Sequence, residues 1–173
     1  ATVNGDRKLS AQQGTEGTDT LRSIERLQFA DARLALDVGA TQSAGQAVLL
    51  LGAVLPGTLV LDASKQALLG SVMGLFDQGY TLPVLAGAVM RLPIWDVLTG
   101  QAMPTPADVA RYLLTNVNGT TPDAGLLATA TATLGAQAQT AAEGQWLVEL
   151  AASATNQARI DLVGLAAGGL VYA

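Results

Sequence analysis

Charge is distributed unevenly along this 173-residue chain, and that asymmetry limits how the chain can fold. Residues 1–37 hold 11 of the 23 charged residues, and the other 136 residues hold only 12. Half of all residues are hydrophobic, mostly Ala, Leu and Val, so the weakly charged stretch can bury a substantial core. We therefore place a boundary near Val38-Gly39-Ala40, between a segment 1–37 and a domain 38–173.

The first 37 residues carry the turn signals and the alternation of β structure. Asn4-Gly5 favours a hairpin turn with a short strand on either side. Residues 10–20 are rich in Gly, Thr and Gln, which predicts a loop. Segments 26–29 and 33–36 alternate hydrophobic with polar or small residues, as in two half-buried strands joined by a turn at Asp31-Ala32.

From Thr41 onward the hydrophobic spacing is helical, and helices are expected at residues 42–55, 63–78, 81–91, 93–100, 105–117, 122–136, 138–154 and 156–168. Thr105-Pro106-Ala107-Asp108 supplies an N-cap, a proline at the first helical position and an acid in the first turn. The predicted fold class is mainly α, with a small N-terminal β-hairpin or β-cap followed by an Ala/Leu-rich helical bundle. A weak likeness between residues 49–57 and 112–120 leaves open a degenerate two-fold helical repeat.

Composition excludes several classes of chemistry. The chain contains no Cys and no His, so a disulfide, a thiolate nucleophile or a Ser-His-Asp triad cannot form within it. Glu143 and Glu149 are six residues apart and would point in different directions from one helix, so they form no carboxylate pair. The net charge is −5 without a Lys/Arg cluster, which argues against nucleic acid as a partner.

The uncharged run 47–61 is interrupted by Pro56-Gly57 and is too short for a membrane span. We expect a buried helix there, followed by a loop. The tail 162–173 is also uncharged, and it fits either a packed last helix or an exposed recognition tail.

Single residues in the helical part have structural interpretations. Trp95 and Trp146 are expected to anchor the core of a chain with only 4% aromatic residues. Asn116 is a loop former by default. Arg159 and Asp161 are expected on a solvated helix face.

Four stretches resemble segments of known bacterial proteins. Gly14-Thr15-Glu16-Gly17-Thr18-Asp19-Thr20-Leu21 resembles one calcium-binding nonapeptide repeat, with Thr15 where the second glycine stands. The run 18–31 resembles the segment that closes blocks of such repeats in RTX proteins, which leave the cell by type I secretion. Residues 113–126 and 156–172 resemble a helical domain of unknown function that recurs beside RTX repeats.

The RTX resemblance implies a calcium site with Asp19 as the natural ligand and with Gly17 and Glu16 nearby. Calcium would sit between successive repeat turns, and the partner turn would lie upstream of this chain. The alternative from the residues themselves is a structural end cap in which Asp19 accepts from turn amides.

These resemblances imply a non-catalytic C-terminal module of a secreted or cell-surface bacterial protein, serving export, folding, and attachment or self-association. Its partners would be the upstream region of the same protein or its own copies, and the type I secretion machinery. A C-terminal signal-like tail would guide export, and extracellular calcium would favour folding afterwards. Two alternatives stay open: an accessory part of an extracellular enzyme such as a hydrolase, with its catalytic residues in another segment, and an S-layer-like structural protein.

Overall fold

The fold is that of a computed structural model, which describes residues 2–3, 6–10, 18–30, 32–56, 65–137 and 144–173. The described strands are β1 (Thr2–Val3), β2 (Asp6–Ser10), β3 (Thr18–Leu21), β4 (Arg26–Gln28), β5 (Arg33–Ala35) and β6 (Leu170–Tyr172). The described helices are α1 (Ser43–Val54), α2 (Gln66–Asp77), α3 (Leu82–Met90), α4 (Trp95–Thr99), α5 (Pro106–Asn118), α6 (Ala124–Gln137), α7 (Gln145–Ala152), α8 (Ala154–Arg159) and α9 (Leu162–Gly168). The mainly α fold class with a small N-terminal group of antiparallel strands is confirmed.

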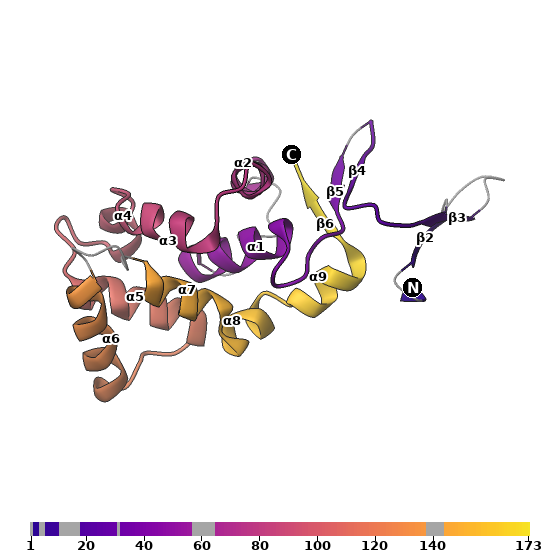
Figure 1. The fold of residues 1–173 in the computed structure, drawn as a ribbon. Helices are drawn as coiled ribbons and strands as arrows, with labels where there is room; N and C mark the ends of the chain where they lie inside the picture. Colours follow the sequence, from indigo (N-terminus) through magenta and orange to yellow (C-terminus); the bar gives the residue numbers. More distant parts are fainter. Residues whose placement is uncertain (1, 4–5, 11–17, 31, 57–64, 138–143) are drawn as a thin grey trace.

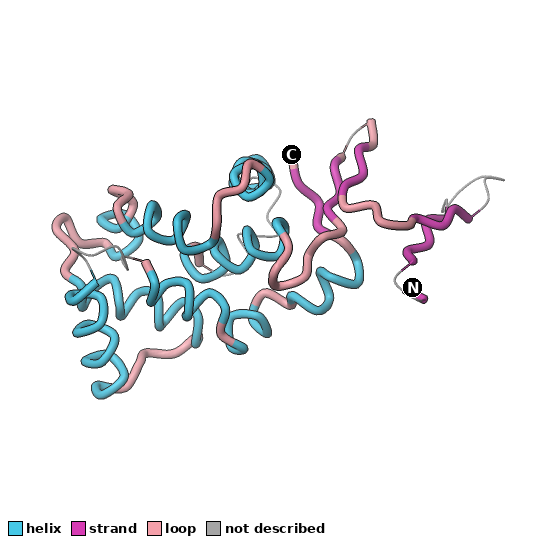
Figure 2. Tube along the Cα trace, in the orientation of Figure 1, coloured by secondary structure: helices cyan, strands magenta, loops and turns pink. Residues whose placement is uncertain are grey.

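The helices gather at one end of the molecule and the strands at the other, as Figure 2 shows. Helix α1 lies in the middle of the helical part and contacts α2, α3, α5, α7, α8 and α9. Every residue from Ala47 to Val54 is buried, so this part of α1 has no polar face and is covered on all sides. This helix accounts for the first part of the uncharged run 47–61, and residues 57–64 lie outside the described part of the chain.

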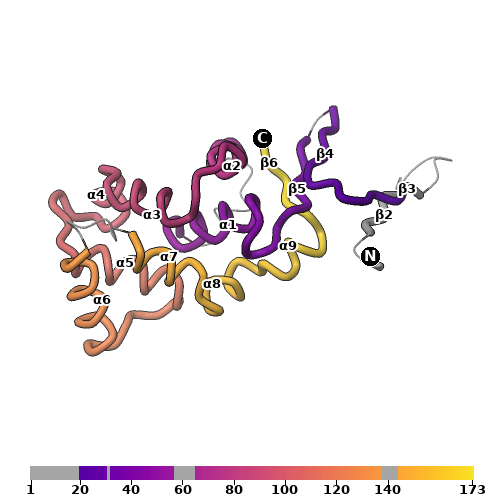
Figure 3. Tube along the Cα trace, in the orientation of Figure 1, coloured from indigo at the N-terminus to yellow at the C-terminus, as the bar shows by residue number. Residues whose placement is uncertain are grey.

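The strands form two separate antiparallel sheets. Strands β1, β2 and β3 make one sheet, which projects away from the helices in Figure 1. Strands β4, β5 and β6 make the other, so the last strand of the chain pairs with a strand of the first 37 residues. Figure 3 shows β6 beside β5, close to the C-terminus.

The C-terminal strand also lies against a helix. The Ala173 amide donates to the Gln66 carbonyl at 3.3 Å, and a side chain at Gly70 would overlap the Ala173 carbonyl oxygen. The tail 162–173 is therefore a short helix followed by a paired strand, an arrangement that a hydrophobic pattern read along one segment does not reveal.

Most described helices lie close to where the local signals predict them. The expected helix 138–154 is described only as α7, because residues 138–143 lie outside the described residues and the extended backbone of Ser153 ends the helix. The expected helix 156–168 is broken in two, because Asp161 adopts a left-handed conformation with φ of 51°. Its carboxylate accepts from the Gly164 amide at 3.1 Å and so caps α9. Asp161 is exposed as expected, but it begins a new helix.

A strand lies where the sequence predicts one at 33–36, but the buried face is the opposite one: Leu34 and Leu36 are expected to be buried, and Ala35 is buried instead. Ala35 is fully buried, whereas Leu34 is only partly buried. The reason is the position of Leu170 opposite Ala35 in β6, which turns that face of the sheet toward the helices.

Candidate functional site

Of the three predicted calcium residues, the structure describes one, Asp19. Gly17 and Glu16 fall outside the described residues. Asp19 is described by its backbone only, in β3, where it pairs with Leu9 of β2. The expected loop 10–20 therefore ends earlier than predicted, because antiparallel pairing with β2 overrides its turn-rich composition.

Among the residues that the structure describes, no cluster of three or more acidic groups could hold a metal ion. The calcium site remains a prediction from the repeat-like sequence.

The structure instead assembles a polar cluster where α1 ends. We call Tyr112, Asn116, Asn156 and Arg159 the α1 cap cluster. The last carbonyls of a helix have no partner within it and need one from elsewhere when they are buried. The Asn116 Nδ2 group shares its two hydrogens among three carbonyls at this end, on Gly52 (3.1 Å), Ala53 (2.7 Å) and the C-cap residue Leu55 (3.1 Å).

Two further members of the cap cluster donate to the same end of α1. The Tyr112 hydroxyl donates to the Val54 carbonyl at 2.9 Å. The Arg159 guanidinium donates to the Gly52 carbonyl and, at 3.3 Å, to Asn156 Oδ1. Burial lowers the pKa of Arg159 and raises the pKa of Tyr112, because a partly desolvated charge is disfavoured in each case.

Asn156 is the most deeply buried member of the cluster, with no exposed surface. Its Nδ2 group donates to the Leu49 carbonyl at 2.9 Å and to the Ala151 carbonyl at 2.8 Å. One side chain thus joins α1 to the end of α7, and its oxygen accepts from Arg159. A buried amide with its groups satisfied in this way stabilises one specific helix arrangement.

Two expectations about these residues are wrong. Asn116 lies inside α5 and is no loop former, because its amide finds carbonyls on a neighbouring helix. Arg159 is partly buried and not on a solvated face, because α8 turns it toward α1. The signal that could have found them is spacing: Tyr112 and Asn116 are four apart and Asn156 and Arg159 three apart, so each pair shares a helix face.

An open groove of about 570 Å³ lies beside the cap cluster. One wall is a stripe along α5, made of Asp108, Arg111, Tyr112, Thr115 and Asn116. The other lining residues are Thr99 at the end of α4, Gln101 shortly after it, and Pro56 shortly after α1. The groove therefore exists because Asn116 and Tyr112 hold α5 against the end of α1.

Asp108 in this groove has a structural task of its own. Its Oδ2 accepts from the Thr105 amide at 3.0 Å and the Thr105 hydroxyl at 2.6 Å, which makes a capping box at the predicted N-cap of α5. Its Oδ1 accepts from Arg111 at 3.3 Å. The hydrogen bond from the Thr105 hydroxyl is the main cause that holds the pKa of Asp108 below its usual value, and the positive charge of Arg111 contributes less.

A smaller cavity of about 210 Å³ lies on the other side of α5 and is mainly apolar. Its lining residues are Met90, Trp95, Pro104, Pro106, Val109, Leu134, Gln137 and Gly144. Trp95 is buried, donates from Nε1 to the carbonyls of Val89 and Met90 at 3.2 Å, and packs edge-on against Tyr112. Its predicted core role is confirmed, and Trp146 is partly buried against the same core.

Several described carboxylates have a structural partner. Asp123 lies just before α6 and accepts from the Leu126 amide at 2.8 Å. Asp37 pairs with Arg26 and accepts from the Ala44 amide at 3.2 Å, and Asp77 pairs with the same arginine at 3.3 Å. These groups hold helix ends in place, which is a different task from exchanging protons with a substrate.

Comparison of the chain with models of protein families, with curated proteins and with solved structures gives no match. Of the helices described, none has both the length and the apolar character that crossing a bilayer requires. The site must therefore be interpreted from its own chemistry.

Proposed function

We propose that this chain is a non-catalytic C-terminal module of a secreted bacterial protein and attaches to a β-structured neighbour through the sheet β4–β5–β6. The observation that supports attachment is an apolar row that crosses all three strands. Leu27 lies opposite Leu34, and Leu34 lies opposite Val171, so the three side chains share one face of the sheet.

The two faces of this sheet have different environments. On the inner face, Ala35 and Leu170 are buried against the helical part. On the outer face, Leu27 and Leu34 are only partly buried and Val171 is 45% exposed. A sheet whose outer face is an exposed or partly buried apolar row is suited to packing on a second layer.

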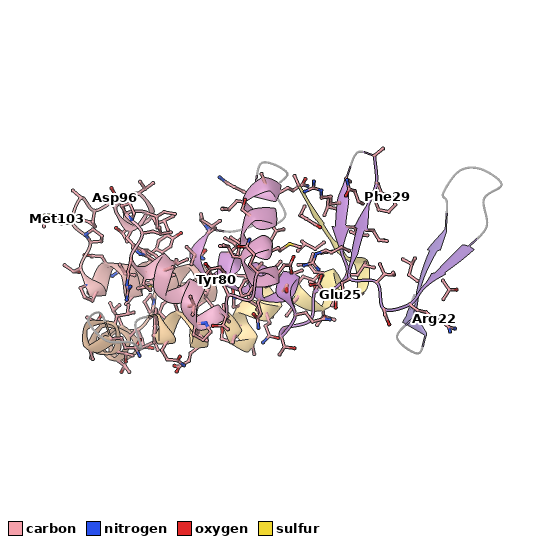
Figure 4. All side chains as sticks on the ribbon, turned by 45° about the horizontal axis from the view of Figure 1, so that its top comes forward. Arg22, Glu25, Phe29, Tyr80, Asp96 and Met103 are labelled. Carbon is pink, nitrogen blue, oxygen red and sulfur yellow. The ribbon has the colours of Figure 1, made fainter. Side chains whose placement is uncertain are left out.

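Further apolar side chains lie close to this face in the sequence. Ile24 precedes β4 and is 42% exposed, and Phe29 follows it and is 43% exposed. Figure 4 shows Phe29 on the strand end of the molecule, far from Met103 at the other end. The neighbour in this proposal is the upstream region of the same protein or a second copy of the chain.

The secretion part of the proposal rests on the resemblance of residues 14–21 to one RTX repeat and of residues 18–31 to the segment that closes blocks of such repeats. The non-catalytic part is supported by the carboxylates at helix ends and by a sequence without His or Cys. In such a module, calcium outside the cell would shift the chain from unfolded to folded by binding the folded state.

Two measurements on the intact chain test the proposal. Calorimetric calcium titration, with thermal melts in calcium and in chelator, should show saturable binding and a raised melting temperature at concentrations at which the chain associates, because one repeat needs a partner turn to close the site. Sedimentation velocity should show association at high concentration that Val171→Lys abolishes. Val163→Lys is the matched control, because Val163 is 83% exposed on α9 and lies outside the sheet. The proposal would be contradicted by a chain that binds no calcium, stays monomeric at high concentration and sediments in the same way as the Val171→Lys and Val163→Lys variants.

A further inference from the structure

The groove along α5 has the chemistry of a binding site for an uncharged, polyhydroxylated ligand, and we propose that it binds a short segment of a neutral saccharide. This inference goes beyond the proposed function, because a module can be non-catalytic with or without a ligand here. The volume of about 570 Å³ lies within the range of roughly 300–1,000 Å³ that is usual for small-ligand sites.

The groove offers acceptors that are already held in position. The Asn116 amide nitrogen faces α1 and donates to carbonyls there. The Oδ1 atom of the same side chain is left as an acceptor. The Tyr112 hydroxyl donates to Val54, so its oxygen can still accept. Groups fixed in this way lose little conformational entropy when a ligand hydroxyl donates to them.

Donors come from the more exposed part of the same groove. The Arg111 side chain is 51% exposed and has five N–H groups, of which Nη1 donates to Asp108. Thr115 and Gln101 are exposed and add a hydroxyl and an amide. Sugar hydroxyls both donate and accept, so they suit a groove in which donors and acceptors alternate.

The charge balance of the groove disfavours strongly charged ligands. Asp108 and Arg111 form an ion pair at 3.3 Å, so the charged groups among the described lining residues cancel. The Tyr112 ring and the Pro56 ring supply apolar surface between the polar groups. Flat apolar surface next to hydrogen-bonding groups matches the C–H face and the hydroxyl rim of a pyranose.

The test is an NMR titration of the intact ¹⁵N-labelled chain with maltohexaose, cellohexaose and chitotetraose in turn. We expect saturable shifts of the Asn116 side-chain amide and the Arg111 Nε–H signals with at least one of these sugars. Arg111→Ala and Thr115→Ala should each weaken that binding, the arginine variant about tenfold because it removes a charged donor.

Matched controls separate the groove from the rest of the surface. Arg33→Ala and Thr129→Ala change the same residue types on β5 and α6, and both should leave the affinity unchanged. No shift with any of the three sugars would overturn the inference. So would shifts that persist in Arg111→Ala and Thr115→Ala, or binding of a sulfated saccharide alone, which would make the ligand an anion. None of these results depends on calcium or on association, so they leave the proposed function to its own test.

Discussion

The two ends of α1 are closed by different means. At its N-terminal end, the closing groups come from the residues just before the helix: Asp37 accepts from the Ala44 amide at 3.2 Å through its carboxylate, and from the Gly45 amide at 3.2 Å through its carbonyl. At its C-terminal end, the donors are Tyr112, Asn116 and Arg159, which lie 58 to 107 residues further along the chain.

This difference separates local from long-range specification. The N-terminal end of α1 can form as soon as Asp37 contacts the Ala44 and Gly45 amides, which are close in the sequence. Arg26 of β4 adds an ion pair with Asp37. The C-terminal end cannot be closed until α5 and α8 have packed against α1. The groove, which includes Asn116 and Tyr112, depends on that later step.

The largest expected effect is at the N-terminal end, where helix and preceding backbone touch. A methyl group in Gly45→Ala would overlap the Gly39 carbonyl oxygen, and backbone cannot move aside as a side chain can. We expect a loss of about 3 kcal/mol in the free energy of unfolding, measured by urea denaturation. Gly74→Ala on α2 is the control: no described atom lies within 4 Å of its added methyl, so it should gain about 0.5–1 kcal/mol.

The next effect is at the buried amide of the cap cluster. Asn156→Ala removes the donor to the Leu49 and Ala151 carbonyls and the acceptor for Arg159. The expected loss in the free energy of unfolding is about 2–3 kcal/mol, because the partly buried Arg159 guanidinium loses Asn156 Oδ1 as an acceptor. Asn118→Ala, at an exposed position of α5, should change stability by less than about 0.5 kcal/mol. Equal losses in the two variants would show that the buried amide contributes no special stability.

A smaller effect should distinguish donation from mere contact at the same end. Asn116→Asp keeps the size of the side chain but turns three donated bonds into a carboxylate facing carbonyl oxygens. We expect a loss of about 2 kcal/mol in urea denaturation near neutral pH. Much of it should be regained near pH 3, where a protonated Asp can donate again. A loss that is the same at both pH values would contradict this account.

The smallest effect is a pH dependence at the start of α5. Because the pKa of Asp108 is lowered in the folded chain, its contribution to stability is present above pH 3.8 and is lost as the pH falls through the lowered value. Thermal melts between about pH 6 and pH 2 should therefore fall less steeply for Asp108→Asn than for the wild type. Thr105→Val removes the main cause of the shift and should flatten the curve in the same direction. A wild-type slope in Thr105→Val would contradict the assignment.

Much of the fold could be predicted from local patterns. The capping box at Thr105 and Asp108, the cap at Asp123 and the uncharged helix at 47–54 each depend on residues within one turn or one segment. Such signals act before any tertiary contact forms, which is why the sequence reveals them.

The candidate site could not be predicted in the same way. Asn and Arg are residue types common in loops and on surfaces, so Asn116 and Arg159 do not stand out in the sequence. The one indication is that Tyr112 lies four residues before Asn116 and Asn156 three residues before Arg159, so each pair shares a helix face. Their partners are backbone carbonyls, which every residue has and no sequence pattern marks.

By itself, the sequence determined a chain without His or Cys chemistry, a charged β-rich beginning and a weakly charged helical body with capped helices. Tertiary structure alone decided that α1 lies at the centre, that β6 returns to pair with β5, and that three distant side chains close the C-terminal end of α1. The physical reason is range. Helix periodicity and capping act over a few residues, whereas burial of α1 on all sides leaves carbonyls that only distant donors can satisfy.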